Sequence, residues 1–148
     1  MSNKNFNKNF GFSKFSQNDF YNKVNKELIN SLDIRSNQKI VDLGCGSGGI
    51  TNLILEKLFT SNSNNFSIIA VDHSDTILNE AKNNLKTISE SILSFVQSRY
   101  EEFSTKLKEK VDLVVLGNAI HYLDDKELVI KDVMKILKPN GKFAFNSS

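Results

Sequence analysis

Residues 41–51 read VDLGCGSGGIT, and this segment is the starting point for predicting the architecture. It begins inside a short apolar run, passes through a cluster of glycines and continues into a segment whose apolar side chains recur at helical spacing. Glycines at such a place permit tight turns and let backbone amides approach a ligand without obstruction by a Cβ atom. The stretch therefore predicts a strand, a ligand-binding loop and a helix in succession.

The same alternation repeats along the chain. Strands are predicted at residues 39–43, 66–71, 92–96, 111–116 and 142–145. Helices are predicted from Ser16 to Leu32, at 50–58, at 74–85 and at 101–110. The helix at 74–85 follows a Ser74 or Asp75 cap and carries the apolar residues Ile77, Leu78, Ala81 and Leu85. A last helix is predicted from Asp124, which with Glu127 makes a capping-box-like start, to Leu137, with Leu128, Val133, Met134 and Leu137 facing inward. The turn Lys138-Pro139-Asn140-Gly141 would stop the last helix. This order predicts an α/β fold, a doubly wound, mainly parallel Rossmann-like sheet of about five strands with helices on both faces.

Length and composition indicate one globular domain. The 148 residues divide into an N-terminal arm, residues 1–15, and a domain, residues 16–148. A net charge of +2 disfavours nucleic acid as a partner, and no apolar run is long enough to span a membrane or to act as a signal peptide, which favours a cytoplasmic protein. One cysteine and two histidines offer no spacing typical of a structural metal site. A small-molecule ligand is favoured.

The glycine loop alone is compatible with a dinucleotide and with another nucleotide-type ligand. Gly44, Gly46 and Gly49 fit the dinucleotide fingerprint, and Asp72 follows the second strand near the distance expected for a ribose-binding acid. Asp42 separates the two alternatives, because a carboxylate just before the glycines would repel the pyrophosphate of a dinucleotide. A cationic ligand would be stabilised there, so a nicotinamide-dependent oxidoreductase is disfavoured.

From Asp42 onward the sequence resembles the class I S-adenosylmethionine-dependent methyltransferases. Their first motif, an acidic residue followed by Gly-x-Gly-x-Gly, is present as Asp42, Gly44, Gly46 and Gly48. The resemblance continues through AVDHS at 70–74, VDLVVLGNAIHYL at 111–123 and ILKPNGKF at 136–143, and it covers about residues 40–145. It implies a methyltransferase that uses S-adenosyl-L-methionine and transfers a methyl group by in-line displacement.

The resemblance also implies roles for individual residues. Asp42 and the loop of Gly44, Cys45, Gly46 and Gly48 would hold the methionine part of the cofactor. Asp72 would accept hydrogen bonds from the ribose hydroxyls, with His73 near the adenine edge. The alternatives are that Asp72 caps the following helix, that His73 is an exposed loop residue and that Cys45 is only a small packed side chain.

Two later segments complete the predicted site. Many family members place a Gly-Asp pair after the third strand to grip adenine, but this chain has Arg99 where the acid is expected, which leaves adenine to Ser98, Tyr100 or backbone amides. Tyr100 could equally belong to the core. After the fourth strand, Asn118 and His121 would face the boundary between cofactor and acceptor. His121 is a candidate general base, and its alternative is a packing role in that loop.

The chain ends where the family usually adds a sixth and a seventh strand, so we expect a C-terminally incomplete domain. The predicted fifth strand would then leave an exposed apolar edge along residues 142–146, which could pair with another chain. A small-molecule acceptor is expected, because residues 118–123 resemble small-molecule members and lack an Asn-Pro-Pro-Tyr type motif. The alternative function is a non-catalytic cofactor-binding module that lacks its acceptor site.

Overall fold

A computed structural model of the protein describes residues 19–63, 65–117 and 125–146. Its elements in chain order are α2 (Asp19–Ser31), β1 (Lys39–Leu43), α3 (Gly49–Thr60), β2 (Ser67–Asp72), α4 (Asp75–Asn84), β3 (Leu93–Gln97), the 3-10 helix η2 (Phe103–Lys106), β4 (Val111–Leu116), α5 (Lys126–Ile136) and β5 (Leu137–Phe145). The predicted arm and the predicted cap Ser16 lie outside the described residues. None of the helices in the described part has the length and apolar character that crossing a membrane requires.

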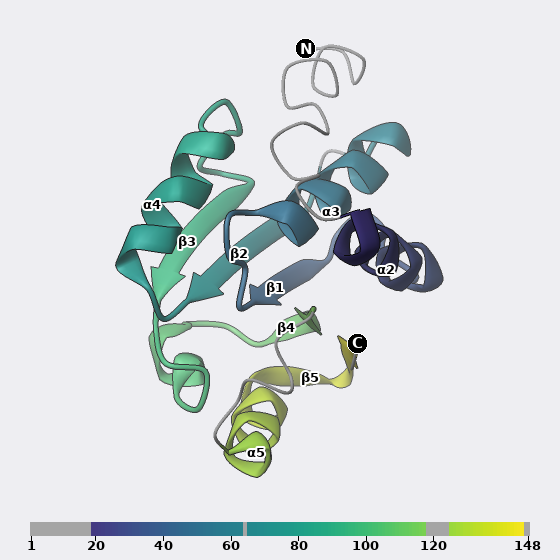
Figure 1. The fold of residues 1–148 in the computed structure, drawn as a ribbon. Helices are drawn as coiled ribbons and strands as arrows, with labels where there is room; N and C mark the ends of the chain where they lie inside the picture. Colours follow the sequence, from purple (N-terminus) through teal and green to yellow (C-terminus); the bar gives the residue numbers. More distant parts are fainter. Residues whose placement is uncertain (1–18, 64, 118–124, 147–148) are drawn as a thin grey trace.

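The described strands form one parallel sheet in the order β3-β2-β1-β4-β5 (Figure 1). β1 pairs with β2 on one side and with β4 on the other, so the direction of winding reverses at β1. In open parallel sheets, ligands bind beyond the carboxyl ends of the strands at such a reversal. The predicted doubly wound α/β fold is confirmed, and it places the glycine loop at that point.

Each face of the sheet carries its own core, because successive side chains of a strand point to opposite faces. α2, α3 and α4 cover one face, and η2 and α5 cover the other (Figure 1). The first core contains Ile40, Ile54, Leu58, Ile68, Leu78 and Leu113, and the second contains Val41, Val71, Phe103, Val114, Val129 and Val133. The sheet is therefore held between two apolar layers, which fixes the strand ends that carry the site.

The face that α5 turns to the core agrees with the prediction at Val133 and Leu137 and differs from it at Leu128 and Met134. Val129, Asp132, Val133 and Ile136 are buried, whereas Leu128 is 48% exposed and Met134 is 63% exposed. The prediction counted apolar residues only, and the inward face contains a polar residue, Asp132. Its carboxylate accepts hydrogen bonds from the Ser104 backbone N–H at 2.8 Å and from the Ser104 hydroxyl at 2.6 Å. These two hydrogen bonds connect α5 to η2.

Replacing Asp132 with alanine is expected to lower the free energy of unfolding by about 2 kcal/mol, because both Ser104 groups lose a charged acceptor in a buried place. Urea denaturation of the two proteins measures the difference. Glu127→Ala, on the exposed face of the same helix, is the control and should change it by less than about 0.5 kcal/mol. Equal losses in the two variants would contradict a specific role for Asp132.

Three other expectations need correction. The helix expected at residues 101–110 is only the 3-10 turn η2, because the segment offers two inward apolar anchors, the buried Phe103 and the half-buried Leu107, and no longer helical face. Ile77 of α4 is exposed instead of packed inward. The last helix is capped by Asp125, whose side chain accepts from the Leu128 N–H at 3.1 Å, while Asp124 lies outside the described residues.

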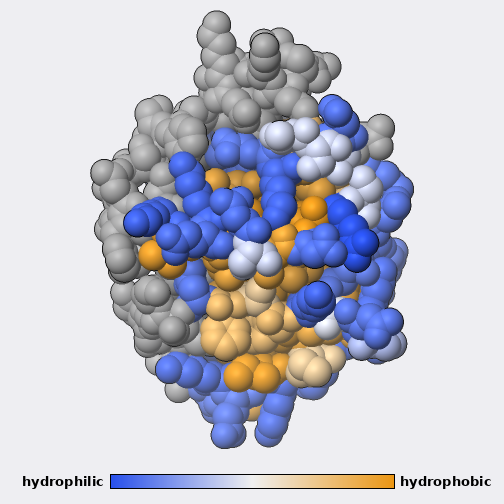
Figure 2. Space-filling model, turned by 90° about the vertical axis from the view of Figure 1, so that its right-hand side faces the viewer, coloured by the Kyte–Doolittle hydropathy of each residue, from blue (hydrophilic) through white to orange (hydrophobic). Residues whose placement is uncertain are grey.

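β5 begins earlier than predicted. It starts at Leu137, opposite Val111, and regains its register with Lys142 opposite Leu113, so the predicted turn at 138–141 is a bulge within the strand pairing. In the described part of the chain β5 pairs only with β4. Phe145 is 47% exposed, and hydrophobic surface crosses the middle of the face that Figure 2 shows. The exposure of Phe145 on β5 agrees with the predicted apolar edge at that residue, while Phe143 and Ala144 are partly buried, and a chain that pairs with the edge remains a prediction.

Candidate functional site

The glycine loop between β1 and α3 is held against the end of β2. The backbone N–H groups of Gly44 and Cys45 both donate to the Val71 carbonyl, at 2.7 and 2.9 Å. Gly44, Gly46 and Gly48 have φ angles of 73°, 56° and 106°, a left-handed conformation that residues with a Cβ rarely adopt. A Cβ built on Gly46 would meet no atom within 4 Å. The glycine at 46 is therefore required by backbone conformation, and the space beside it is open.

Asp42 lies beneath this loop and is fully buried. Its Oδ2 accepts from the Thr51 hydroxyl at 2.5 Å, while its Oδ1 has no hydrogen-bond partner among the described residues. Burial raises the pKa of Asp42 to about 7, hydrogen bonding by Thr51 opposes the increase, and the nearby Asp72 adds to it. A buried acceptor oxygen without a donor is unfavourable unless a cation or a donor comes to it.

Asp72 closes β2 and orders the backbone around it. Its Oδ2 accepts from the Gly46 N–H and its Oδ1 from the Ser74 N–H, each at 3.0 Å. The side chain of Ser74, not that of Asp72, caps α4 by accepting from the Ile77 N–H at 3.3 Å. The carboxylate of Asp72 thus links the glycine loop to the start of α4, and only 3% of the residue is exposed.

Two aromatic side chains border Asp72 with longer contacts. The Tyr100 hydroxyl donates to Asp72 Oδ2 at 3.4 Å, and His73 Nδ1 lies 3.3 Å from Asp72 Oδ1. The Tyr100 hydroxyl also lies 3.3 Å from His73 Nδ1, and the two rings pack edge to face with centroids 5.4 Å apart. Burial raises the pKa of Tyr100, and the charge of Asp72 raises it further. The hydroxyl is therefore a donor at neutral pH.

The remaining predicted residues lie in different surroundings. The Ser98 N–H donates to the Asp72 carbonyl at 3.0 Å, but its buried hydroxyl donates to the Arg99 carbonyl at 2.9 Å. The Arg99 side chain is exposed and pairs with Glu101 at 3.3 Å. Cys45 is buried, and burial raises the pKa of its thiol. Asn118 and His121 fall outside the described residues.

Two residues that sequence reasoning did not single out support the loop. Thr51 fixes the Asp42 carboxylate, and its place in the first turn after the glycines is a local signal that could have suggested it. Asn84, at the end of α4, donates from Nδ2 to the Ser47 carbonyl at 3.0 Å. That contact joins residues 37 positions apart, and no local pattern indicates it.

The end of β4 also lies against α3. A Cβ on Gly117 would stand 1.9 Å from Ile50 Cδ1 and 3.4 Å from the Asn25 side chain of α2. A larger residue at 117 would therefore displace the end of the Ile50 side chain, which lies in the first turn of α3 after the glycine loop. Within the residues that the structure describes, no group of three or more His, Cys, Asp or Glu side chains is placed to hold a metal ion.

A family described as a methyltransferase domain matches residues 34–148. The chain belongs to this methyltransferase family. The match includes β1 to β5, the glycine loop, Asp42 and Asp72, so the residues that form the carboxyl-edge site all lie inside the family's domain. The predicted family is thereby confirmed.

Individual relatives agree with this assignment. The methyltransferase domain is 29% identical over 143 residues to malonyl-[acyl-carrier protein] O-methyltransferase of Acetivibrio thermocellus, covering 92% of this chain and 47% of that protein. It is 31% identical over 110 residues to a probable S-adenosylmethionine-dependent methyltransferase of Saccharomyces cerevisiae, covering 73% of this chain and 35% of that protein. The chain thus spans about half or less of the length of these curated relatives.

A solved structure shares the fold. A putative S-adenosyl-L-methionine-dependent methyltransferase from Methanococcus maripaludis superposes with a TM-score of 0.68 at 20% identity, over 97% of this chain and 61% of that one. At this identity the likeness supports the architecture of the sheet and its helices, while the site depends on the contacts described above.

Proposed function

We propose that this methyltransferase domain binds S-adenosyl-L-methionine at the carboxyl edge of the sheet and methylates a small-molecule acceptor. The observation that carries the proposal is the pairing of a buried Asp42 oxygen without a donor and a glycine loop that faces open space. The name of the Saccharomyces cerevisiae relative supports the same cofactor.

The residues present fit this cofactor at its methionine end. S-Adenosylmethionine carries a cationic sulfonium and an ammonium group, and it supplies an electrophilic methyl group when it is bound. Asp42 would stabilise this positive charge, since its Oδ1 is the acceptor that the described residues leave without a donor. The left-handed glycines keep Cβ atoms away from the loop, so backbone groups are accessible to the ligand.

The nucleoside end requires an exchange of hydrogen bonds at Asp72. The two short contacts, from the Gly46 and Ser74 N–H groups, are part of the fold and would be retained. A carboxylate has about four acceptor sites, and the Gly46 N–H, the Ser74 N–H and the Tyr100 hydroxyl use three of them. The two ribose hydroxyls would therefore displace the long contact from Tyr100, and His73 Nδ1, 3.3 Å from Asp72 Oδ1, would make room for them. Tyr100 and His73 would then lie beside the nucleoside, where adenine is expected.

The chain's own contribution to methyl transfer is positioning. A rigid loop fixed by Val71, Asp72 and Asn84 would keep the methyl group in line with an acceptor, which accounts for much of the acceleration of a displacement reaction. A general base is needed only for an acceptor that must lose a proton. His121 is the proposed base in such a case.

Calorimetric titration of the chain with S-adenosylhomocysteine tests the cofactor, with NAD as the comparison. We expect saturable binding of S-adenosylhomocysteine and none of NAD, because the buried Asp42 would repel a pyrophosphate. Preference for NAD, or no binding by a chain shown to be folded by circular dichroism, would contradict the proposal. Turnover of an acceptor from a panel of small organic acids, phenols and amines would then exclude a non-catalytic binding module.

A further inference from the structure

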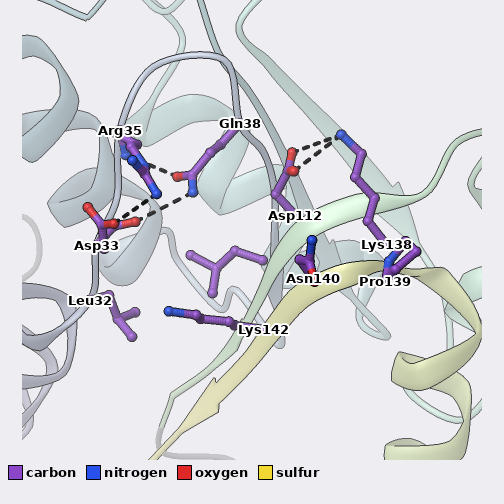
Figure 3. A pocket seen from close by; sticks show the side chains of 10 residues that line it. Leu32, Asp33, Arg35, Gln38, Asp112, Lys138, Pro139, Asn140 and Lys142 are labelled. Atoms are coloured by element: carbon purple, nitrogen blue, oxygen red, sulfur yellow. Dashed lines mark hydrogen bonds and ion pairs between the residues drawn. The ribbon is translucent and has the colours of Figure 1, made fainter.

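A cavity lies at the opposite edge of the sheet from the glycine loop. It has a volume of about 420 Å³ and opens where β1, β4 and β5 begin (Figure 3). One wall is the connection from α2 to β1, and the other is the bulge of β5. Its size falls within the range of pockets that bind small molecules, about 300–1,000 Å³. We call it the amino-edge cavity.

The β5 bulge builds the second wall. Between Leu137 and Lys142 the strand inserts extra residues opposite β4, and a Cβ on Gly141 would lie 3.0 Å from both the Leu137 side chain and the Lys138 carbonyl. A Cβ there would be in tighter than ordinary van der Waals contact, so the glycine eases this close approach. Lys138 and Pro139 are neighbours in sequence and would point to opposite faces of a regular strand, but in the bulge both line the same cavity, together with Asn140 and Lys142 (Figure 3).

The carboxylates that line the amino-edge cavity are already engaged. Asp112 accepts from the Lys39 N–H at 2.7 Å, and both of its oxygens lie 3.2 Å from Lys138 Nζ. Asp33 pairs with Arg35 at 3.1 Å within the connection between α2 and β1. Each acidic side chain of the lining therefore has a cationic partner.

One lining cation has no such partner. Lys142 makes no ion pair or hydrogen bond within the described residues, and its ammonium group points across the cavity toward the wall that contains Leu32 (Figure 3). The side-chain amide of Asn140, which also has no partner among the described residues, points into the same space. Leu32 and Leu113 supply apolar surface. The cavity thus combines donors for one anionic group with a place for a hydrocarbon portion.

We infer that the amino-edge cavity binds a small organic monocarboxylate, with the carboxylate on Lys142 and Asn140 and the apolar part against Leu32 and Leu113. Lining groups with three cations and two paired carboxylates retain one positive charge, which matches one negative charge on the ligand. Because the strands are parallel, this site and the glycine loop lie at opposite edges of the sheet. The ligand is therefore a second ligand, distinct from the cofactor and the acceptor of the proposed function.

Hexanoate is the probe for this inference. In a low-salt buffer without cofactor, we expect saturable hexanoate binding to the full chain, with NMR shift changes at Leu113 and Asn140 and none at Gly46. Lys142→Met keeps the length of the side chain and removes its charge, and it should weaken binding by about tenfold, the value expected for a hydrogen-bonded ion pair. Asn140→Ala, at an exposed position, should weaken it several-fold without affecting folding.

Lys131→Met is the matched control, since Lys131 is an exposed lysine of α5 outside the cavity, and it should leave hexanoate binding unchanged. Equal binding by the wild type and Lys142→Met would overturn the inference, as would the absence of saturable binding to the folded chain. Inorganic phosphate that binds as tightly as hexanoate would overturn the organic ligand class, because the apolar walls would then contribute nothing.

Discussion

Replacing Asp72 with alanine is expected to weaken S-adenosylhomocysteine binding by about 100-fold. The proposed site uses this carboxylate as the acceptor for two ribose hydroxyls, and hydrogen bonds to a charged group contribute about 1.5–3 kcal/mol each. Two such bonds at the lower end of this range total about 3 kcal/mol, which corresponds to 100-fold or slightly more in Kd. The Gly46 N–H also loses its acceptor, so the glycine loop becomes less ordered in the same variant. Calorimetric titration measures the change.

Two further variants separate recognition from folding. Asp72→Asn retains the shape and one acceptor oxygen, and it should weaken binding by about tenfold, between the wild type and alanine. Asp75→Ala changes a neighbouring exposed carboxylate in the first turn of α4 and should bind like the wild type. Wild-type affinity in a folded Asp72→Ala protein would show that the ligand does not use this carboxylate, even if the cofactor itself is correctly assigned.

The sequence was most informative where burial alone selects the structure. β1 and β4 were predicted with the bounds that the structure has, because the runs at 39–43 and 111–116 are buried on both sides of a parallel sheet. For α5, the burial of Val133 and Leu137 was predicted correctly and that of Leu128 and Met134 wrongly, because the polar Asp132 belongs to the inward face and an apolar pattern does not select it. The start of β5 was also missed, since the pairing of Leu137 with Val111 depends on a strand distant in sequence.

The candidate site also contains features that could be predicted from the sequence and features that could not. Asp42 and the left-handed glycines stand together in the sequence, so their proximity could be predicted. The contact between Tyr100 and Asp72 could not be predicted, because the two residues are 28 positions apart in the sequence. The partners of Asp42 illustrate the limit further. A sequence shows a carboxylate before a glycine loop, but only the packing shows that one oxygen is held by Thr51 and the other has no donor among the described residues.

The buried Asp42 should make the stability of the protein decrease as the pH rises from about 4 to about 7. Its pKa is about 7 in the folded protein and 3.8 when it is unperturbed, so the folded state keeps a proton that the unfolded state releases. Stability from this proton is fully present below the unfolded pKa and is lost as the pH rises through the folded value. From pH 5 to pH 7 this loss amounts to about 2 kcal/mol, because the folded carboxyl is only half ionised at pH 7.

Asp42→Asn isolates this effect, because asparagine has the shape of the protonated carboxyl and cannot ionise. We expect the variant to gain about 3 kcal/mol relative to the wild type between pH 5 and pH 8. Urea denaturation at the two pH values measures this difference. Asp75→Asn, an exposed carboxylate of α4, should show no such gain. If the free energies of unfolding of the wild type and Asp42→Asn changed in parallel with pH, Asp42 would be ionised at pH 5, and its burial would not control its protonation.

The expected result would instead mean that a bound cation must overcome an unfavourable ionisation of Asp42. Cofactor affinity should then rise from pH 6 to pH 8 in the wild type and stay constant in Asp42→Asn.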